Sequence, residues 1–201
     1  MLITDAVHVW RESDGDYHIE WEATHPDTDV TVEPLSEGGV LVAHYTEEPV
    51  KRARLSGLAA DTRHFFRLSD QHGTEVVVAE RRLGMQGTPN FRDFGGYRTV
   101  DGRQVKWGYL FRSGQLNHLS DQDLELLANL NLDLICDFRK LEEQASEPSR
   151  LPENRPKVTA LPIIPGSNAR FFEEAEGRKM AGRQTMHDFM LEVNRDFAED
   201  Q

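Results

Sequence analysis

Cysteine is nearly absent from this sequence, which holds a single one, Cys136, among 201 residues. One cysteine cannot form a disulfide within the chain, and this favours a reducing, cytoplasmic location. Long hydrophobic runs are absent as well: there is no stretch of about 18 apolar residues, so we expect no membrane span. The N-terminus lacks a basic segment followed by an apolar one, so we expect no signal peptide.

Metal-binding and nucleotide-binding patterns are also missing. The eight histidines show no metal-ligand spacing, there is no cysteine pair, and no glycine-rich dinucleotide fingerprint occurs. We therefore expect no metal and no cofactor. The net charge of −12 argues against broad electrostatic binding to nucleic acid or anionic lipid.

Positive charge is concentrated in one segment of this acidic sequence. Residues 1–83 carry 8 Lys and Arg against 16 Asp and Glu, a net of −8. Residues 84–118 reverse the balance, with five basic and two acidic residues and a net of +3. Such a basic island suits a small anionic ligand, and a chance cluster of solvated arginines is the alternative.

The first 83 residues predict seven short strands separated by turn signals. Several runs alternate, so that Tyr17, Ile19 and Trp21 would share one apolar face. Seven strands in about 80 residues predict an all-β sandwich of the immunoglobulin-like kind. The expected strands are Ala6–Trp10, Tyr17–Glu22, Asp29–Val32, Val40–Tyr45, Val50–Leu55, His64–Ser69 and Glu75–Glu80.

Two features of this half resemble a fibronectin type III domain: Trp21, and the segment Leu58-Ala-Ala-Asp-Thr-Arg-His-Phe-Phe-Arg-Leu68. That family usually reads Leu-x-Pro-x-Thr-x-Tyr-x-Phe-Arg-Val there. In this sequence Ala60 replaces the proline and His64 replaces the tyrosine. We expect His64 to donate a hydrogen bond across the same corner. An unrelated β-sandwich is the alternative.

Residues 84–201 alternate between helical and strand patterns, which is typical of an α/β layer fold. A hairpin turn is expected at Val100-Asp-Gly102, and Ser120 is a good N-cap for a helix. The pattern then predicts two buried strands, a short helical turn between them and a final helix with one apolar stripe. The strands are Leu132–Phe138 and Val158–Ile164, the turn is Leu141–Ala145 before Pro148, and the helix is Thr185–Phe197 with the stripe Met186, Phe189, Met190, Val193 and Phe197. We predict two domains, residues 1–83 and 84–201.

Three separated segments carry the strongest functional signal: Thr88-Pro-Asn-Phe-Arg-Asp-Phe-Gly-Gly-Tyr97, Leu110-Phe-Arg-Ser-Gly114 and Leu134-Ile-Cys-Asp-Phe-Arg139. In this order they resemble the N-terminal part of the catalytic domain of the bacterial tyrosine phosphatase family, whose members carry an N-F-R-D-hydrophobe-G-G motif. The resemblance covers residues 88–201. It implies a phosphoric monoester hydrolase that works through a cysteinyl-phosphate intermediate and needs no metal.

The nucleophile loop of that family, Cys-x5-Arg, does not occur in these residues. Its thiolate attacks phosphorus, and its backbone N–H groups and arginine bind the phosphate oxygens. The residue six places after Cys136 is Glu142, and we expect Cys136 to be a small buried hydrophobe on a strand. The 201-residue chain alone is therefore predicted to be an inactive, incomplete phosphatase-like domain.

Four residues are implied by the resemblance to lie around the phosphate loop: Asp93, Arg112, Asp137 and Arg139. We expect Arg112 and Arg139 to bind the substrate, because the planar fork of arginine can hold two phosphate oxygens at once. Asp93 is a possible auxiliary that would assist proton transfer or orient the phosphate loop.

Five residues are expected to support that site structurally. Asn90, Arg92 and Asp137 would hold loops through buried hydrogen bonds. Gly95 and Gly96 would allow a backbone turn that β-carbons would obstruct.

The sequence thus predicts a tyrosine phosphatase, with dual-specificity or phosphoinositide substrates left open, preceded by a fibronectin-like module. Its expected partners are a phosphorylated protein or phospholipid substrate and a protein bound through the β-sandwich. The alternative is a non-catalytic fragment or a dead homologue that binds partners through the sandwich.

Overall fold

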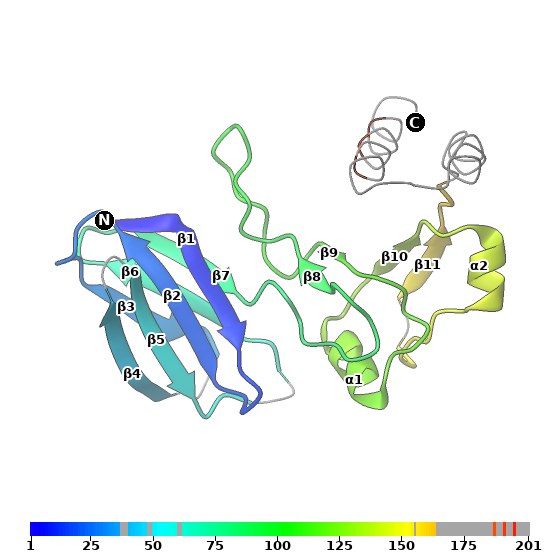
Figure 1. The fold of residues 1–201 in the computed structure, drawn as a ribbon, viewed down its shortest axis with the longest axis horizontal. Helices are drawn as coiled ribbons and strands as arrows, with labels where there is room; N and C mark the ends of the chain where they lie inside the picture. Colours follow the sequence, from blue (N-terminus) through cyan, green and yellow to red (C-terminus); the bar gives the residue numbers. More distant parts are fainter. Residues whose placement is uncertain are drawn as a thin grey trace. The chain divides into compact units, whose positions relative to one another are not determined.

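The computed structural model describes residues 1–36, 40–47, 50–59, 62–154 and 156–163, together with residues 187, 191 and 195. Strands dominate these residues and helices are few (Figure 1). The chain divides into two compact units: Met1–Leu134 with Glu147–Lys157, and Ile135–Ser146 with Val158–Gln201. The predicted domain boundary after residue 83 falls inside the first unit and stays a prediction.

Seven strands form within residues 1–83, one at each predicted run, and we call these residues the β-region. All neighbouring strands are antiparallel. They form two sheets of order β1-β2-β5-β4 and β3-β6-β7 (Figure 1). The strands are β1 (Leu2–Arg11), β2 (Tyr17–Ala23), β3 (Val30–Pro34), β4 (Val40–Glu47), β5 (Val50–Ser56), β6 (Phe65–Asp70) and β7 (Glu75–Ala79).

One hydrophobic core is shared by the two sheets. Because side chains alternate along a strand, Tyr17, Ile19 and Trp21 on β2 all point inward, and each is 0% exposed. They belong to the same buried cluster as Phe66 and Leu68 on β6 of the other sheet. The predicted core position of Trp21 is therefore confirmed.

His64 occupies the corner where the sequence pattern would have a tyrosine, and it is buried. Its Nε2 lies 2.9 Å from the Ala59 carbonyl oxygen. A carbonyl only accepts, so Nε2 carries the proton and donates. Nδ1 lies 2.6 Å from the Ser36 hydroxyl, which donates to it when the ring is neutral. The predicted hydrogen bond across the corner is present.

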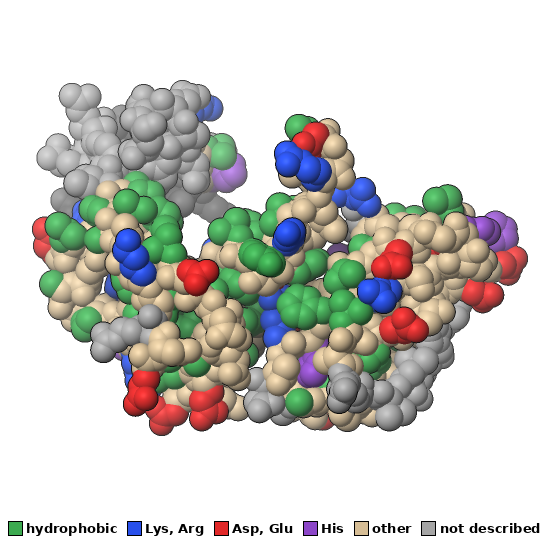
Figure 2. Space-filling view, turned by 180° about the vertical axis from the view of Figure 1, so that it is seen from behind, with side chains coloured by type: hydrophobic (Ala, Val, Ile, Leu, Met, Phe, Trp, Pro, Cys, Tyr) green, Lys and Arg blue, Asp and Glu red, His purple; other side chains and the backbone are tan. Residues whose placement is uncertain are grey.

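A short ladder and a hairpin follow the β-region. Strand β8 (Arg92–Asp93) pairs antiparallel with β9 (Phe111–Arg112). Between them the predicted turn at Val100-Asp-Gly102 forms: Gly102 has a φ of 81°, and the Thr99 N–H donates to the Arg103 carbonyl over 2.8 Å. The hairpin projects as a long loop (Figure 1) with charged side chains near its tip (Figure 2).

Helix α1 (Asp121–Asn129) begins after Ser120, as predicted. The Ser120 hydroxyl accepts from the Asp123 N–H at 3.1 Å, and the Asp123 carboxylate accepts from the Ser120 N–H at 2.9 Å. This is a reciprocal capping box. The same carboxylate accepts from the N–H groups of Gln86 and Gly87, each at 2.8 Å. These bonds hold the start of α1 against Gln86 and Gly87, which lie just before the N-F-R-D segment.

The remaining described elements are β10 (Leu134–Asp137), α2 (Leu141–Ser146) and β11 (Lys157–Ala160). Strands β10 and β11 pair with each other. The N–H groups of Lys157 and Leu161 donate to the carbonyls of Asp133 and Asp137, and this equal advance along both strands makes the pair parallel. The short helix at the predicted turn is confirmed.

The predicted burial of these two strands is wrong. Leu134 is 51% exposed and Val158 is 44% exposed. Within the described residues the sheet has two strands, and a two-stranded sheet cannot enclose a core of its own. For the same reason Cys136 on β10 is exposed, although the sequence suggested a buried hydrophobe.

The predicted helix Thr185–Phe197 and its apolar stripe lie outside the described residues, apart from His187, Leu191 and Arg195, which are helical. Among the residues that the structure describes, no helix combines the length and the apolar character needed to cross a membrane.

Candidate functional site

The structure brings together the first two of the three matched segments. The Phe94 N–H donates to the Leu110 carbonyl at 2.8 Å, and the Gly114 N–H donates to the Pro89 carbonyl at 2.9 Å. Between these two bonds, β8 and β9 pair Arg92 with Arg112. The N-F-R-D segment and the Phe-Arg-Ser-Gly segment thus form one small structural element.

Asp93 is the most deeply held residue of this element, with 1% of its surface exposed. Its Oδ1 accepts from the Gly95 N–H at 2.6 Å, and its Oδ2 accepts from the Gly108 N–H at 2.7 Å. The Arg63 Nη1 lies 2.6 Å from the same Oδ2. One buried carboxylate therefore joins the turn after β8, the end of the hairpin and the β-region.

Arg63 supplies the positive charge that this buried carboxylate needs. The Arg63 and Asp93 side chains are 6% and 0% exposed. The Arg63 Nη2 donates to the Glu80 carbonyl at 2.9 Å, and the guanidinium lies 5.0 Å from the ring centre of Phe65 and 5.5 Å from that of Phe111. Because a buried charge is costly unless it is paired, the pair fixes Asp93 in place. These surroundings favour a role in holding the loop over a role in moving a proton.

The need for glycine at positions 95 and 96 comes from Trp107. A β-carbon on Gly95 would lie 2.4 Å from the Trp107 Cα, and one on Gly96 would lie 2.5 Å from its ring. Gly96 also has a φ of 83°, which disfavours other residues. The Trp107 Nε1 donates to the Val77 carbonyl on β7 at 3.0 Å. The indole ring is therefore anchored to the β-region and packs against the two glycines.

Asn90 and Arg92 lie at the start of the same loop. Asn90 has a φ of 58°, a left-handed conformation that asparagine tolerates better than most residues. Its Oδ1 accepts from the Arg92 Nη2 at 3.2 Å. Asn90 is exposed and Arg92 is partly buried, so this bond is less buried than the sequence suggested. Arg112, the expected phosphate ligand on β9, is exposed.

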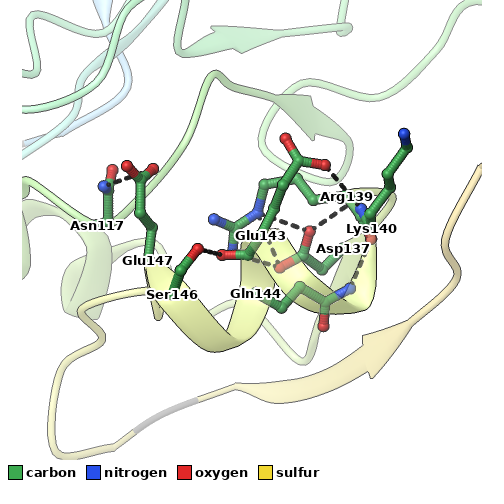
Figure 3. A network of polar contacts seen from close by, with 8 residues as sticks. All are labelled: Asn117, Asp137, Arg139, Lys140, Glu143, Gln144, Ser146 and Glu147. Carbon is green, nitrogen blue, oxygen red and sulfur yellow. Dashed lines mark hydrogen bonds and ion pairs between the residues drawn. The ribbon is translucent and has the colours of Figure 1, made fainter.

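Asp137 and Arg139 belong to the second unit and bind each other (Figure 3). The Arg139 Nη2 donates to Asp137 Oδ2 at 2.7 Å, and its Nε donates to Oδ1 at 3.0 Å. Hydrogen bonds from Arg139 hold the pKa of the Asp137 carboxyl below its ordinary value, against the opposing effect of burial. Asp137 is therefore an anion that orients Arg139.

Side chains of helix α2 bind the backbone next to this pair (Figure 3). The Gln144 amide donates to the Arg139 carbonyl at 2.8 Å, and the Glu143 carboxylate accepts from the Lys140 N–H at 3.0 Å. The peptide bond that follows Arg139 is thus held at both its carbonyl and its N–H. Within the described ranges, no group of three or more His, Cys, Asp and Glu residues is arranged to hold a metal ion.

Comparison with known proteins connects this element to a family. Residues 83–201 match the family described as the tyrosine phosphatase family. The chain belongs to the tyrosine phosphatase family. A relative from Cupriavidus necator, named "putative tyrosine-protein phosphatase", is 39% identical over 121 residues. The match covers 60% of this chain and 44% of the relative, so the chain spans less than half of that protein's length.

Sequence reasoning missed three residues that hold the N-F-R-D segment in place. Arg63, Arg81 and Trp107 are in this group. The Arg81 Nη1 donates to the Asp93 carbonyl at 2.9 Å, and its guanidinium lies 4.8 Å from the centre of the Trp107 ring. Arg63 and Arg81 precede the matched family region, so no family motif could have pointed to them. The one available signal was that a buried Asp93 requires a positively charged partner.

Proposed function

We propose that this chain is part of a phosphatase that hydrolyses phosphate monoesters through a cysteinyl-phosphate intermediate. The observation that carries the proposal is the family match over residues 83–201. The chemistry requires a Cys-x5-Arg loop, and Cys136 with Glu142 six places on does not supply it. The proposal therefore assigns the nucleophile to sequence outside these 201 residues. The greater length of the relative is consistent with this.

In this proposal Arg112 and Arg139 bind phosphate oxygens of the substrate. Arg112 is exposed on β9 and within the described residues has no carboxylate partner. Arg139 is already oriented by Asp137, as a preorganised anion ligand should be. Asp93, together with Asn90, Arg92, Gly95 and Gly96, would hold the loop that faces the nucleophile.

The substrate in this proposal is a phosphorylated protein or a phosphoinositide, and phosphotyrosine is favoured by the name of the family. The β-region would be a fibronectin- or immunoglobulin-like module that binds a protein partner. Two features support this: the strand orders correspond to the four-and-three arrangement of immunoglobulin-like sandwiches, and His64 bonds back across the corner to Ala59.

The test compares the 201-residue chain with the complete product of its gene, using 4-nitrophenyl phosphate and a phosphotyrosine peptide. We expect turnover by the complete protein, its loss when the cysteine of a Cys-x5-Arg loop is changed to serine, and no turnover by the 201-residue chain. Without thiolate and phosphate loop, most of the transition-state stabilisation is gone.

Two outcomes would reject the proposal. One is a complete gene product that contains no Cys-x5-Arg loop or turns over neither substrate, which would favour a non-catalytic binding protein. The other is turnover by the 201-residue chain that Cys136→Ser abolishes, since this would give the reaction a different nucleophile.

A further inference from the structure

Three arginines from three chain segments stand in register at the N-F-R-D element. Arg82 pairs with Arg92 in an isolated antiparallel bridge, and Arg92 pairs with Arg112 across β8 and β9. Residues directly opposite each other on antiparallel strands point to the same face. One face of this small ladder therefore presents Arg82, Arg92 and Arg112 in a line, which we call the arginine row.

The burial of the neighbouring residues confirms which face carries the arginine row. Leu83, Phe91 and Asp93 alternate with the arginines along the chain, and they are 2%, 3% and 1% exposed. Arg82 and Arg112 are exposed, and Arg92 is partly buried. The buried face of the ladder thus points toward Arg63, and the row lies on the opposite, outer face.

The row is electrostatically unfavourable as it stands. Like charges directly opposite each other destabilise a sheet. Among the described residues no carboxylate forms an ion pair with any of the three arginines. The only side-chain partner of Arg92 there is the neutral Asn90 amide oxygen, and its Nε is buried without a partner. This arrangement stands out in a chain with a net charge of −12.

We propose that the arginine row is a binding site for the phosphate groups of an anionic ligand. A guanidinium fork matches the geometry of phosphate oxygens, and a bound dianion would remove the repulsion within the row. Adjacent strands lie about 4.8 Å apart, so the row is about 10 Å long. That length accommodates two phosphate groups side by side and favours a ligand with more than one of them.

The arginine row shares Arg112 with the proposed substrate site of the phosphatase. With Arg82 and Arg92 the row is longer than a single substrate phosphate requires. It would hold a second phosphate of the ligand beside the reacting one. In that respect the inference deepens the proposed function and rests on it. The binding itself does not depend on catalysis, so it can be tested without turnover.

The experiment titrates the 201-residue chain with inorganic phosphate and with pyrophosphate at constant ionic strength, by calorimetry. We expect saturable binding, tighter for pyrophosphate. Single changes Arg82→Gln, Arg92→Gln and Arg112→Gln should each weaken the pyrophosphate affinity by about tenfold, the usual effect of one charge-assisted contact. The matched control is Arg103→Gln, an exposed arginine of the same unit that pairs with Asp101, and it should bind as the wild type does.

Thermal unfolding in chloride separates binding from folding. Because Arg82→Gln and Arg112→Gln remove like-charge repulsion and leave the Arg92–Asn90 bond in place, these two variants should melt at the wild-type temperature or higher. Phosphate should no longer raise the Tm of the triple Gln variant. If the triple variant does not fold, the pyrophosphate affinities of the two exposed single variants, Arg82→Gln and Arg112→Gln, test the site.

Three results would overturn the site: no saturable binding by the wild type, equal affinity in wild type and triple variant, or an equal loss in Arg103→Gln. If the complete protein hydrolyses no phosphate monoester, the proposed function fails. The titration still shows whether the arginine row binds phosphate.

Discussion

The β-region and the β10–α2–β11 segment use similar apolar residues with opposite results. In the β-region, Tyr17, Ile19 and Trp21 are fully buried between two sheets. In the other segment, Leu134, Phe138 and Leu141 are between 51% and 60% exposed. An apolar strand is buried only when a second layer covers it. Within the described residues the β-region provides its own second layer, whereas β10 and β11 do not.

A substitution in the closed core of the β-region should lower the free energy of unfolding more than any other change proposed below. Trp21→Ala should lower the free energy of unfolding by roughly 3–5 kcal/mol, because it removes a large side chain that its neighbours cannot replace. Phe138→Ala in the exposed segment is the matched control and should cost less than about 1 kcal/mol. Urea denaturation followed by circular dichroism measures both. A larger loss for Phe138→Ala would show that its ring is not exposed in solution and that the two segments do not differ in burial.

The second prediction concerns the ion pair between the β-region and the N-F-R-D element. Arg63→Met should cost about 3 kcal/mol, because it leaves the Asp93 carboxylate buried and unpaired. Adding Asp93→Asn should recover part of this loss, giving a coupling free energy above about 1 kcal/mol in a double-mutant cycle. Arg67→Met, which removes a half-exposed pair with Glu75, is the control. Additive effects would mean that Arg63 and Asp93 are independent.

The third prediction concerns the close approach of Trp107 to the glycine pair. Gly95→Ala should cost roughly 1–3 kcal/mol, because its β-carbon would meet the Trp107 backbone and ring. Gly84→Ala has open space around it and should be close to neutral. Differential scanning calorimetry of the two variants makes the comparison. Equal melting temperatures would show that the tryptophan moves aside at little cost.

The smallest effect concerns pH. Burial alone would raise the pKa of the Asp123 carboxyl, but the N–H donors of Ser120, Gln86 and Gly87 outweigh it and hold the pKa below its ordinary value. A depressed pKa in the folded state means that the stabilisation is present at neutral pH and is lost as the pH falls below the ordinary carboxyl range. Asp123→Asn should cost about 1 kcal/mol at pH 7 and progressively less in acid.

Unfolding measured between pH 7 and pH 3 checks this dependence, with the exposed Glu125→Gln as control. A constant difference between wild type and Asp123→Asn across that range would show that the carboxylate charge does not matter there.

The sequence predicted the elements well where the signal is local. Short apolar runs, several of them alternating, with turn signals between them located the seven strands of the β-region. Ser120 located the start of α1, and Val100-Asp-Gly102 located a turn. The burial of β10 and β11 was predicted wrongly. An apolar pattern shows that a strand can be buried, but it does not show whether a second layer covers the strand. Boundaries moved by a few residues, as at β1, which extends to Leu2.

The candidate site was predicted only as a set of motif residues. The matched segments identified Asp93 and Arg112, and the two glycines were expected to avoid a clash. The clashing partner, Trp107, and the ion-pair partner, Arg63, lie 12 and 30 positions away from these residues, and no local pattern connects them. The arginine row depends on strand register, which hydrogen bonding sets and which the order of residues does not display.

The pairing of Arg63 with Asp93 has a consequence for inheritance. Residue 93 lies in the part of the chain that matches the family, and residue 63 lies before it. A substitution of one residue leaves the charge of the other buried and unpaired, so the two residues should change together in descendants of this chain. A relative that carries the N-F-R-D motif without equivalent N-terminal strands must draw its compensating cation from another part of its own chain. Replacing the first 83 residues of this chain by the N-terminal part of such a relative would leave the Asp93 carboxylate buried without Arg63, and the hybrid should be less stable than this chain.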